Sequence, residues 1–192
     1  GLPATFATEE SGCSTLEITM YDKYADIEVV LIYTAFDKLD VITRSAVITN
    51  KSEKPFKITR ALSACVDFDT DKMDMITLNG SWARERAVER LHHGKQLVDS
   101  CRGESSHQNN PFVALCDNNA DEDKGEVFGF NFVYSGNFYA QAEVTQHKKT
   151  RFLMGINPLD FEWLLEKGES FTCPEVVMVH SDEGIGKMSR TF

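Results

Sequence analysis

The chain has 192 residues, of which 20 are Lys or Arg and 30 are Asp or Glu, so its formal net charge is −10 at pH 7. An acidic chain without basic patches argues against nucleic acid or an anionic membrane surface as its partner, because both present phosphates. Its 42% of apolar residues is ordinary for a globular protein, and its length allows one well-packed domain or two small ones.

Alternation of apolar and polar side chains, which is typical of β-strands, dominates the chain. Leu16, Ile18 and Met20 alternate with Glu17 and Thr19, for example. The predicted strands are residues 16–20, 26–33, 41–50, 56–67, 75–78, 83–91, 96–101, 112–116, 127–133, 138–144, 151–154, 161–165 and 171–180. Gly, Asn, Pro and Ser turns separate many of them. This spacing predicts a single all-β domain, an antiparallel sandwich or barrel.

Residues 82–91 (WARERAVERL) are the one segment whose spacing also suits a helix. Glu85 and Glu89 are four residues apart, as are Arg86 and Arg90, which would place each pair on one exposed helical face. The apolar residues of this segment do not decide between the two structures. We predict a strand.

Cysteine use and the first residues bear on the cellular compartment. The five cysteines are scattered and odd in number, without C-x-x-C spacing, which predicts reduced thiols. They are Cys13, Cys65, Cys101, Cys116 and Cys173. The start GLPATFATEE lacks the basic end and apolar stretch of a secretory signal, and no apolar run approaches the ~18 residues that span a bilayer. We expect a cytoplasmic protein with no membrane partner.

The sequence offers no convincing metal or cofactor site. Asp117, Asn119 and Asp121 begin like a calcium loop, but Glu122 replaces the required glycine and Phe128 the bidentate glutamate. A solvated turn is the better interpretation of residues 117–126. The histidines and cysteines lack zinc-ligand spacing, and no phosphate-binding glycine loop, dinucleotide fingerprint or nucleophile elbow is present.

Residues 102–112 (RGESSHQNNPF) are a run of hydrogen-bonding side chains with few charges between two predicted strands. Ser106, His107, Gln108 and Asn109 can each donate and accept hydrogen bonds, which suits sugar hydroxyls or a polar interface. Such side chains can equally satisfy nearby backbone groups and form a self-bonded loop. The spacing alone leaves both interpretations open.

The two tryptophans have different settings. Trp82 and its neighbour Arg84 lie in an Arg/Glu-rich segment, where the indole could stack on a sugar ring. Packing in a core or an interface is the more common role of a tryptophan. Trp163 alternates with Phe161 and Leu165, which predicts a place in the core.

Seven longer segments carry a recognisable pattern. They are GLPAT at 1–5, VITRSAVITN at 41–50, LNGSWARER at 78–86, CRGESSHQNNPF at 101–112, GEVFGFNFVYSGNF at 125–138, MGINPLDFEWLLEKGESFTCPE at 154–175 and HSDEGIGKMSRTF at 180–192. In this order they closely resemble the N-terminal domain of family 36 glycoside hydrolases, the bacterial α-galactosidases, over essentially the whole chain. Asn109 departs from the family pattern HQHN, so no role of that second histidine carries over.

The resemblance implies a partial antiparallel β-supersandwich over residues 1–192, similar to the galactose-mutarotase architecture. The start of the domain and the catalytic (β/α)8 barrel are expected to be absent. Family members hydrolyse terminal α-galactosyl residues of melibiose, raffinose and stachyose with retention, which uses two carboxyl groups about 5–5.5 Å apart. Their nucleophile lies in a Lys-x-Asp-x-Asn motif that this sequence lacks, so no catalytic residue is expected in this chain. The resemblance also implies a tetramer.

Three functions are therefore weighed. The first is a non-catalytic domain that supports the barrel and the oligomer and borders the active site through Trp82, Arg84 and residues 106–109. The second is a free-standing carbohydrate-binding module. The third is epimerase activity from a His107–Glu104 pair, which rests on fold analogy and is the weakest.

Overall fold

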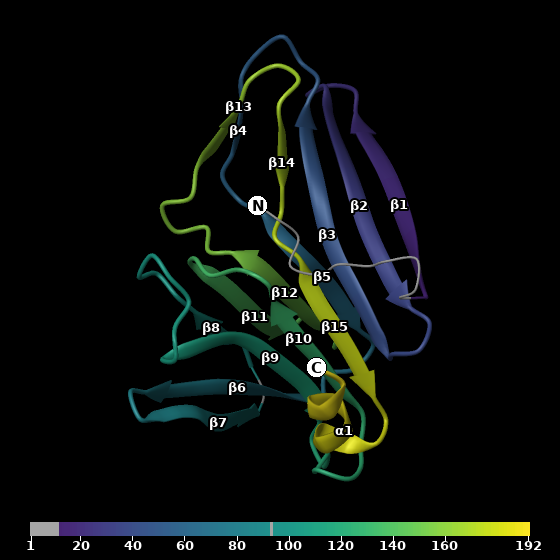
Figure 1. Cartoon of the computed structure of the whole chain (residues 1–192), viewed down its shortest axis with the longest axis vertical. Coiled ribbons are helices and arrows are strands. Elements are labelled where there is room, and N and C mark those ends of the chain that lie inside the picture. The colour runs from purple at the N-terminus through teal and green to yellow at the C-terminus, as the bar shows by residue number, and fades with distance from the viewer. Residues whose placement is uncertain (1–11, 93) are drawn as a thin grey trace.

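The computed structural model describes residues 12–92 and 94–192 (Figure 1). The strands are β1 (Cys13–Asp22), β2 (Ile27–Phe36), β3 (Val41–Asn50), β4 (Phe56–Ile58), β5 (Leu62–Phe68), β6 (Met73–Ser81), β7 (Arg84–His92), β8 (Gln96–Asp99), β9 (Asn109–Asp117), β10 (Val127–Phe132), β11 (Phe138–Val144), β12 (Thr150–Ile156), β13 (Trp163–Leu165), β14 (Ser170–Thr172) and β15 (Val176–Ser181). One short helix, α1 (Gly184–Thr191), follows them. The predicted all-β class is confirmed; the GLPAT segment lies outside the described residues.

Antiparallel sheets of unequal size make up the described chain. The larger has the order β1-β2-β3-β15-β10-β9-β6-β7, with β14 added beside β3, and the smaller has the order β5-β12-β11-β8. β13 and β4 form a separate two-stranded ribbon. In Figure 1, β1–β3 rise on the right and the β6–β7 hairpin projects at the lower left.

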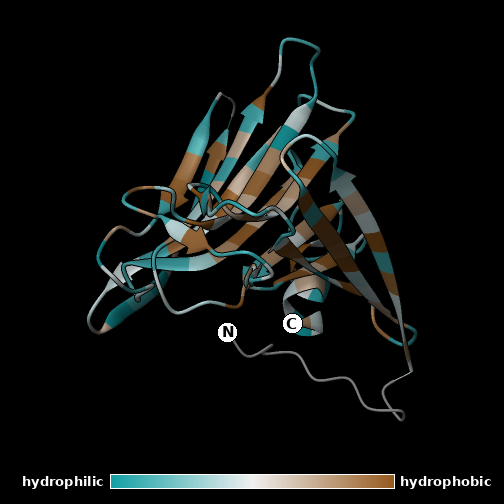
Figure 2. Ribbon diagram, turned by 90° about the horizontal axis from the view of Figure 1, so that it is seen from above, coloured by the Kyte–Doolittle hydropathy of each residue, from teal (hydrophilic) through white to brown (hydrophobic). Residues whose placement is uncertain are grey.

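The main core lies between the two larger sheets. Phe130 and Phe132 of β10 meet Phe138 of β11 and Phe152 of β12, and the rings of Phe130 and Phe152 are 4.2 Å apart. Figure 2 shows the cause: strands carry alternating hydrophobic and hydrophilic bands, whereas the connecting loops are mostly hydrophilic. Each buried aromatic side chain of this kind contributes about 2–3 kcal/mol from the surface it removes from water.

Two predicted strands are divided in the structure. Residues 56–67 form β4 and β5, which pair in different sheets with β13 and β12. Residues 171–180 form parts of β14 and β15, separated by residues 173–175. Pro174 has no backbone N–H for a ladder, so a break there is expected physically.

The helical alternative for residues 82–91 is wrong, because this segment forms most of β7, as predicted. The core placement of Trp163 is also wrong. Its side chain is 49% exposed, although Leu165 on the same short strand is buried. The ribbon of β13 and β4 is too small to cover both residues, and the indole instead lies against Phe171 with ring centroids 5.3 Å apart.

Helix α1 packs on the outer face of the larger sheet. Its first backbone amides have no intrahelical partner, and the loop between β9 and β10 supplies one for each. Ile185 N donates to the carbonyl of Asp121 and Gly186 N to that of Glu122, both at 2.9 Å. A side chain at Gly186 would place its Cβ 2.8 Å from the Glu122 oxygen, so glycine permits this close approach. No helix in the described part of the chain is long and apolar enough to cross a membrane.

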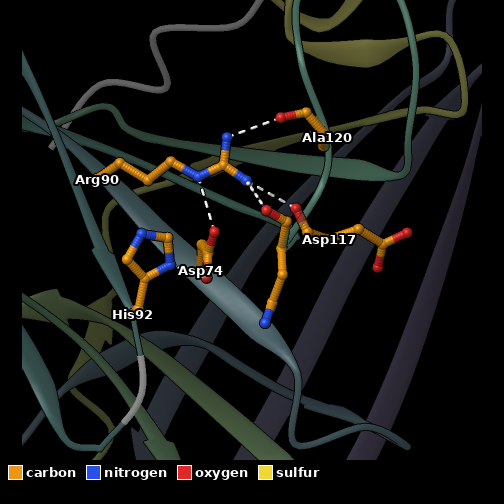
Figure 3. Close-up of polar contacts among 6 residues, drawn as sticks. Asp74, Arg90, His92, Asp117 and Ala120 are labelled. Atoms are coloured by element: carbon orange, nitrogen blue, oxygen red, sulfur yellow. Dashed lines mark hydrogen bonds and ion pairs between the residues drawn. The ribbon is translucent and has the colours of Figure 1, made fainter.

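A buried ion pair holds the same loop from the other side (Figure 3). Asp74 of β6 is fully buried and accepts from Arg90 Nε at 2.7 Å and from His92 Nδ1 at 2.6 Å. The remaining guanidinium N–H groups of Arg90 donate to the carbonyl oxygens of Asp117 (2.8 Å), Asn118 (2.9 Å) and Ala120 (2.7 Å). The β6–β7 hairpin, the loop at 117–125 and α1 are thereby joined.

We predict that Arg90→Lys lowers the free energy of unfolding by about 2–3 kcal/mol, because lysine keeps the charge but loses the fork that reaches three carbonyls. Urea denaturation of the variant and the wild type measures this. Arg86→Lys on the same strand is the matched control and should stay within about 0.5 kcal/mol of the wild type. Equal losses for the two variants would contradict a special role for Arg90.

Candidate functional site

The tip of the β6–β7 hairpin presents Trp82 and Arg84 to solvent. The Trp82 side chain is 85% exposed, so placement in the core of this chain is wrong, and stacking or an interface remains. The turn is tight: a Cβ on Gly80 would lie 2.3 Å from the carbonyl oxygen of Arg84. Ala83 has φ of 60°, and its amide donates to the Glu85 carboxylate at 2.9 Å. The tip is therefore an ordered projection.

The loop between β8 and β9 lies against this hairpin. Gly80 N donates to the carbonyl of Gln108 at 3.1 Å, and Asn109 Nδ2 donates to the carbonyl of Asp99 at 2.7 Å. The self-bonded interpretation therefore holds for Asn109. The side chains of His107 and Gln108 are exposed and make no hydrogen bond to any residue the structure describes.

A cleft of about 390 Å³ lies between the inner face of the β6–β7 hairpin and the edge strand β8. Gln108 of the β8–β9 loop lines it, together with strand residues of β6, β7, β8 and β9: Thr77, Asn79, Gly80, Glu89, Leu91, Leu97, Val98, Asp99 and Asn109. A smaller hollow of about 210 Å³ continues from it along the loop and includes Ser106. Asp99, Gln108 and Asn109 line both, so the two hollows are adjacent.

The structure thus gathers only part of the predicted site. Ser106, Gln108 and Asn109 line the hollows, whereas Trp82 and Arg84 lie at the hairpin tip outside their lining. His107 and Glu104 are both exposed, and no hydrogen bond or ion pair joins them, so the pair needed for epimerase chemistry is not formed.

Sequence reasoning missed the strand residues of the cleft. Thr77 and Asn79 alternate on the same face of β6, and Glu89 is directly opposite Thr77 on β7. Polar residues on the inner face of two predicted strands were the available signal. Thr77 is buried whereas Glu89 is exposed, so the covering layer ends between β6 and β7.

The other potentially reactive side chains contribute to the packing and ion pairing of the fold and not to a site. Both carboxylate oxygens of buried Asp74 are occupied by Arg90 and His92, which leaves none for a substrate. Burial raises the pKa of the Cys116 and Cys173 thiols to about 11, so neither is a ready nucleophile. Across residues 12–92 and 94–192, no group of three His, Cys, Asp or Glu side chains could hold a metal ion.

Glu175 is a carboxyl group with an unusual environment. Burial raises its pKa, and a hydrogen bond with Thr43 partly offsets the effect. One of its oxygens, Oε1, is buried without a hydrogen-bond partner among the described residues. Glu175 immediately precedes β15, whereas the cleft is built from β6, β7 and β8, so it belongs to no part of the candidate site.

Comparison with known families gives a match to the glycosyl hydrolase family 36 N-terminal domain over residues 1–166. Among curated proteins, α-galactosidase AgaA from Geobacillus stearothermophilus is 56% identical over the whole chain. The probable α-galactosidase C from Aspergillus flavus is 43% identical, also over the whole chain. The chain spans only 27% and 26% of these relatives, respectively.

Solved structures agree. AgaA from G. stearothermophilus in complex with raffinose superposes with a TM-score of 0.96 at 55% identity, over 99% of this chain and 27% of that one. An α-galactosidase from Lactobacillus brevis gives a TM-score of 0.95 at 38% identity, over 99% of this chain and 26% of that one.

The raised pKa of Glu175 predicts a pH-dependent cost in stability. When the folded-state pKa exceeds the unfolded one, stability falls as pH rises between the two values, and the cost is fully present above the folded pKa. Glu175→Gln should therefore be more stable than the wild type at pH 7, and the difference should shrink toward about pH 4, where the glutamate is protonated. Thermal unfolding across this range measures it. Glu17→Gln, at an exposed position on β1, is the control; a Glu175→Gln effect independent of pH would contradict the assignment.

Proposed function

The chain belongs to the N-terminal domain family of family 36 glycoside hydrolases, and from this membership we propose that it is the non-catalytic N-terminal part of an α-galactosidase. The observation that carries the proposal is the agreement of fold and sequence with AgaA, at a TM-score of 0.96 and 55% identity. We assign residues 1–192 to a partial β-supersandwich, with the start of the domain and the catalytic barrel supplied by the rest of the polypeptide.

The complete enzyme is proposed to hydrolyse terminal α-galactosyl residues of raffinose-type oligosaccharides. Solved relatives are described as α-galactosidases in complex with raffinose and with stachyose, which supports this substrate class. Hydrolysis with retention needs two suitably spaced carboxyl groups. This chain contains no Lys-x-Asp-x-Asn motif, so we place both catalytic groups in the barrel and none here.

The role of this domain is then to support the barrel and the oligomer, a tetramer in this proposal. Trp82 and Arg84 are the residue types that dominate protein interfaces when they become buried, and they project from the hairpin tip. Ser106, His107, Gln108 and Asn109 would border the active-site entrance. All five cysteines are unpaired, which supports a cytoplasmic location.

A free-standing carbohydrate-binding module is the alternative. The exposed Trp82 favours it, because an uncovered indole can stack on a pyranose ring. The two proposals differ in what this chain does without a barrel, since only a binding module must recognise sugar through this hairpin tip on its own.

A complete polypeptide that contains this chain should release galactose from raffinose, whereas residues 1–192 alone should release none. Proton NMR of the first product should show the α-anomer, because retention preserves the configuration. A complete polypeptide with a Lys-x-Asp-x-Asn motif after residue 192 but no α-galactosidase activity would overturn the proposal.

His107→Ala in the complete enzyme tests whether the β8–β9 loop borders the substrate. We expect KM for raffinose to rise about fivefold with kcat changed less than about twofold, the pattern of lost uniform binding. Asn110→Ala is the matched control, because Asn110 Nδ2 donates to the Leu78 carbonyl at 3.0 Å. It should cost about 1 kcal/mol of stability and leave KM unchanged. An unchanged KM in His107→Ala would assign the loop to structure.

A further inference from the structure

Several polar side-chain atoms in the cleft between the β6–β7 hairpin and β8 have no hydrogen-bond partner among the described residues. The Glu89 carboxylate and the Gln108 side-chain amide make no hydrogen bond to any described residue. Asp99 accepts from Asn157 at 3.1 Å and from Cys101 through Oδ2, which leaves Oδ1 unused. Asn109 donates through Nδ2 to the Asp99 carbonyl, and its side-chain oxygen Oδ1 accepts no hydrogen bond from a described residue.

Acceptors outnumber donors in this set. Two carboxylates and the Asn109 oxygen accept, and the Gln108 amide both donates and accepts. Acceptors of this kind match a ligand that carries many O–H groups, and a hydroxyl bonded to a carboxylate gives a strong, charge-assisted hydrogen bond. Two carboxylates in one cleft repel a phosphorylated or carboxylated ligand, so the lining argues against an anionic one.

The cleft also offers some apolar surface. Leu91 and Leu97 are 40% and 49% exposed, and both line the cleft beside the polar groups. A pyranose ring has an apolar face of C–H groups as well as its hydroxyl edge, so it can use both kinds of surface. The volume of about 390 Å³ falls in the range of small-molecule sites.

Ordered elements carry the backbone of these residues. Glu89 is paired in register with Thr77 across β6 and β7, and Asn79 Nδ2 donates to Thr77 Oγ1 at 3.0 Å. The Gly80–Gln108 backbone hydrogen bond ties the loop to the hairpin. The backbone of a site built on paired strands is already ordered, so ligand binding must order mainly the side chains of Glu89 and Gln108.

We propose that this cleft binds a neutral hexopyranose, through hydroxyl contacts to Glu89, Asp99 and Gln108 and ring contacts to Leu91 and Leu97. The site goes beyond the proposed function, because it needs neither the barrel nor the exposed Trp82. Residues 1–192 alone should therefore show it, and its failure would leave the assignment to an α-galactosidase untouched.

The test is a two-dimensional ¹H–¹⁵N NMR titration of residues 1–192 with methyl α-galactopyranoside up to ~50 mM, where millimolar affinity is detectable. Shifts should cluster on β6, β7, β8 and residues 106–109. Galactose 6-phosphate should bind at least about fivefold more weakly, because the carboxylates repel its phosphate. Shifts confined to other elements, no shifts at all, or tighter binding of the phosphate would overturn the proposal.

Variants distinguish binding in the cleft from a nonspecific effect of charge or folding. Glu89→Gln should weaken binding about five- to tenfold through loss of one charge-assisted hydrogen bond. Glu17→Gln, on the exposed β1, removes the same charge elsewhere and should leave the affinity unchanged. Gln108→Ala, in the loop, provides a second variant whose effect does not depend on the hairpin. Wild-type affinity in both cleft variants, with wild-type spectra confirming their fold, would also overturn the site.

Discussion

The buried carboxylate of Asp74 is the constraint on which much of this structure depends. A charge with no exposed surface must be matched at close range, and breaking such a pair is far more costly than breaking one at the surface. Arg90 matches it and has N–H groups left over, which reach the carbonyls of residues 117–120. The same loop receives the first amides of α1, so one buried charge positions a hairpin, a loop and a helix.

Because the two main sheets are unequal in size, the larger sheet extends beyond the smaller one at its ends. The smaller sheet ends at β8, so the inner residues Met75 and Thr77 of β6 are buried but β7 is mostly exposed. At the other end of the larger sheet, β1 exposes Leu16, Ile18 and Met20. The two ends differ in chemistry, because the β6–β7 end places Glu89 in one cleft with Asp99 and Gln108. The cleft at the β6–β7 end combines polar groups that have no hydrogen-bond partner among the described residues with the exposed side chains of Leu91 and Leu97, which is why a small hydroxylated ligand is proposed there.

Much of the fold follows from the sequence pattern, since alternation depends on the pleat of the strand alone. The strands at 41–50 and 138–144 have the predicted bounds. Alternation does not say when a chain leaves one sheet for another, so the break between β4 and β5 was not predictable. Trp163 was misplaced because its alternation with Leu165 shows a shared face but not how far the covering layer extends.

The candidate site was less predictable than the fold, for a physical reason. Residues 106–109 form a conspicuous polar run. Glu89 lies in an Arg/Glu-rich strand and Asp99 in another strand, and the two come to line one cleft only because β7 and β8 are edge strands that meet there. Gly184 and Gly186 likewise gave no signal of their structural role in the sequence. They permit the close approach of α1 to the carbonyl oxygens of Asp121 and Glu122, which lie more than sixty residues earlier in the chain.

Side chains on the outer and inner faces of β7 are positioned by the same stretch of backbone. Arg90 points to the outer face, where its four hydrogen bonds fix it to Asp74 and the loop. Glu89 is the preceding residue, so the pleat directs it to the inner face and into the cleft. The position of the proposed sugar-binding carboxylate is therefore set by an anchor on the opposite side of the sheet. The same anchor holds the strand that continues to Trp82 at the tip, so both surfaces share one rigid support.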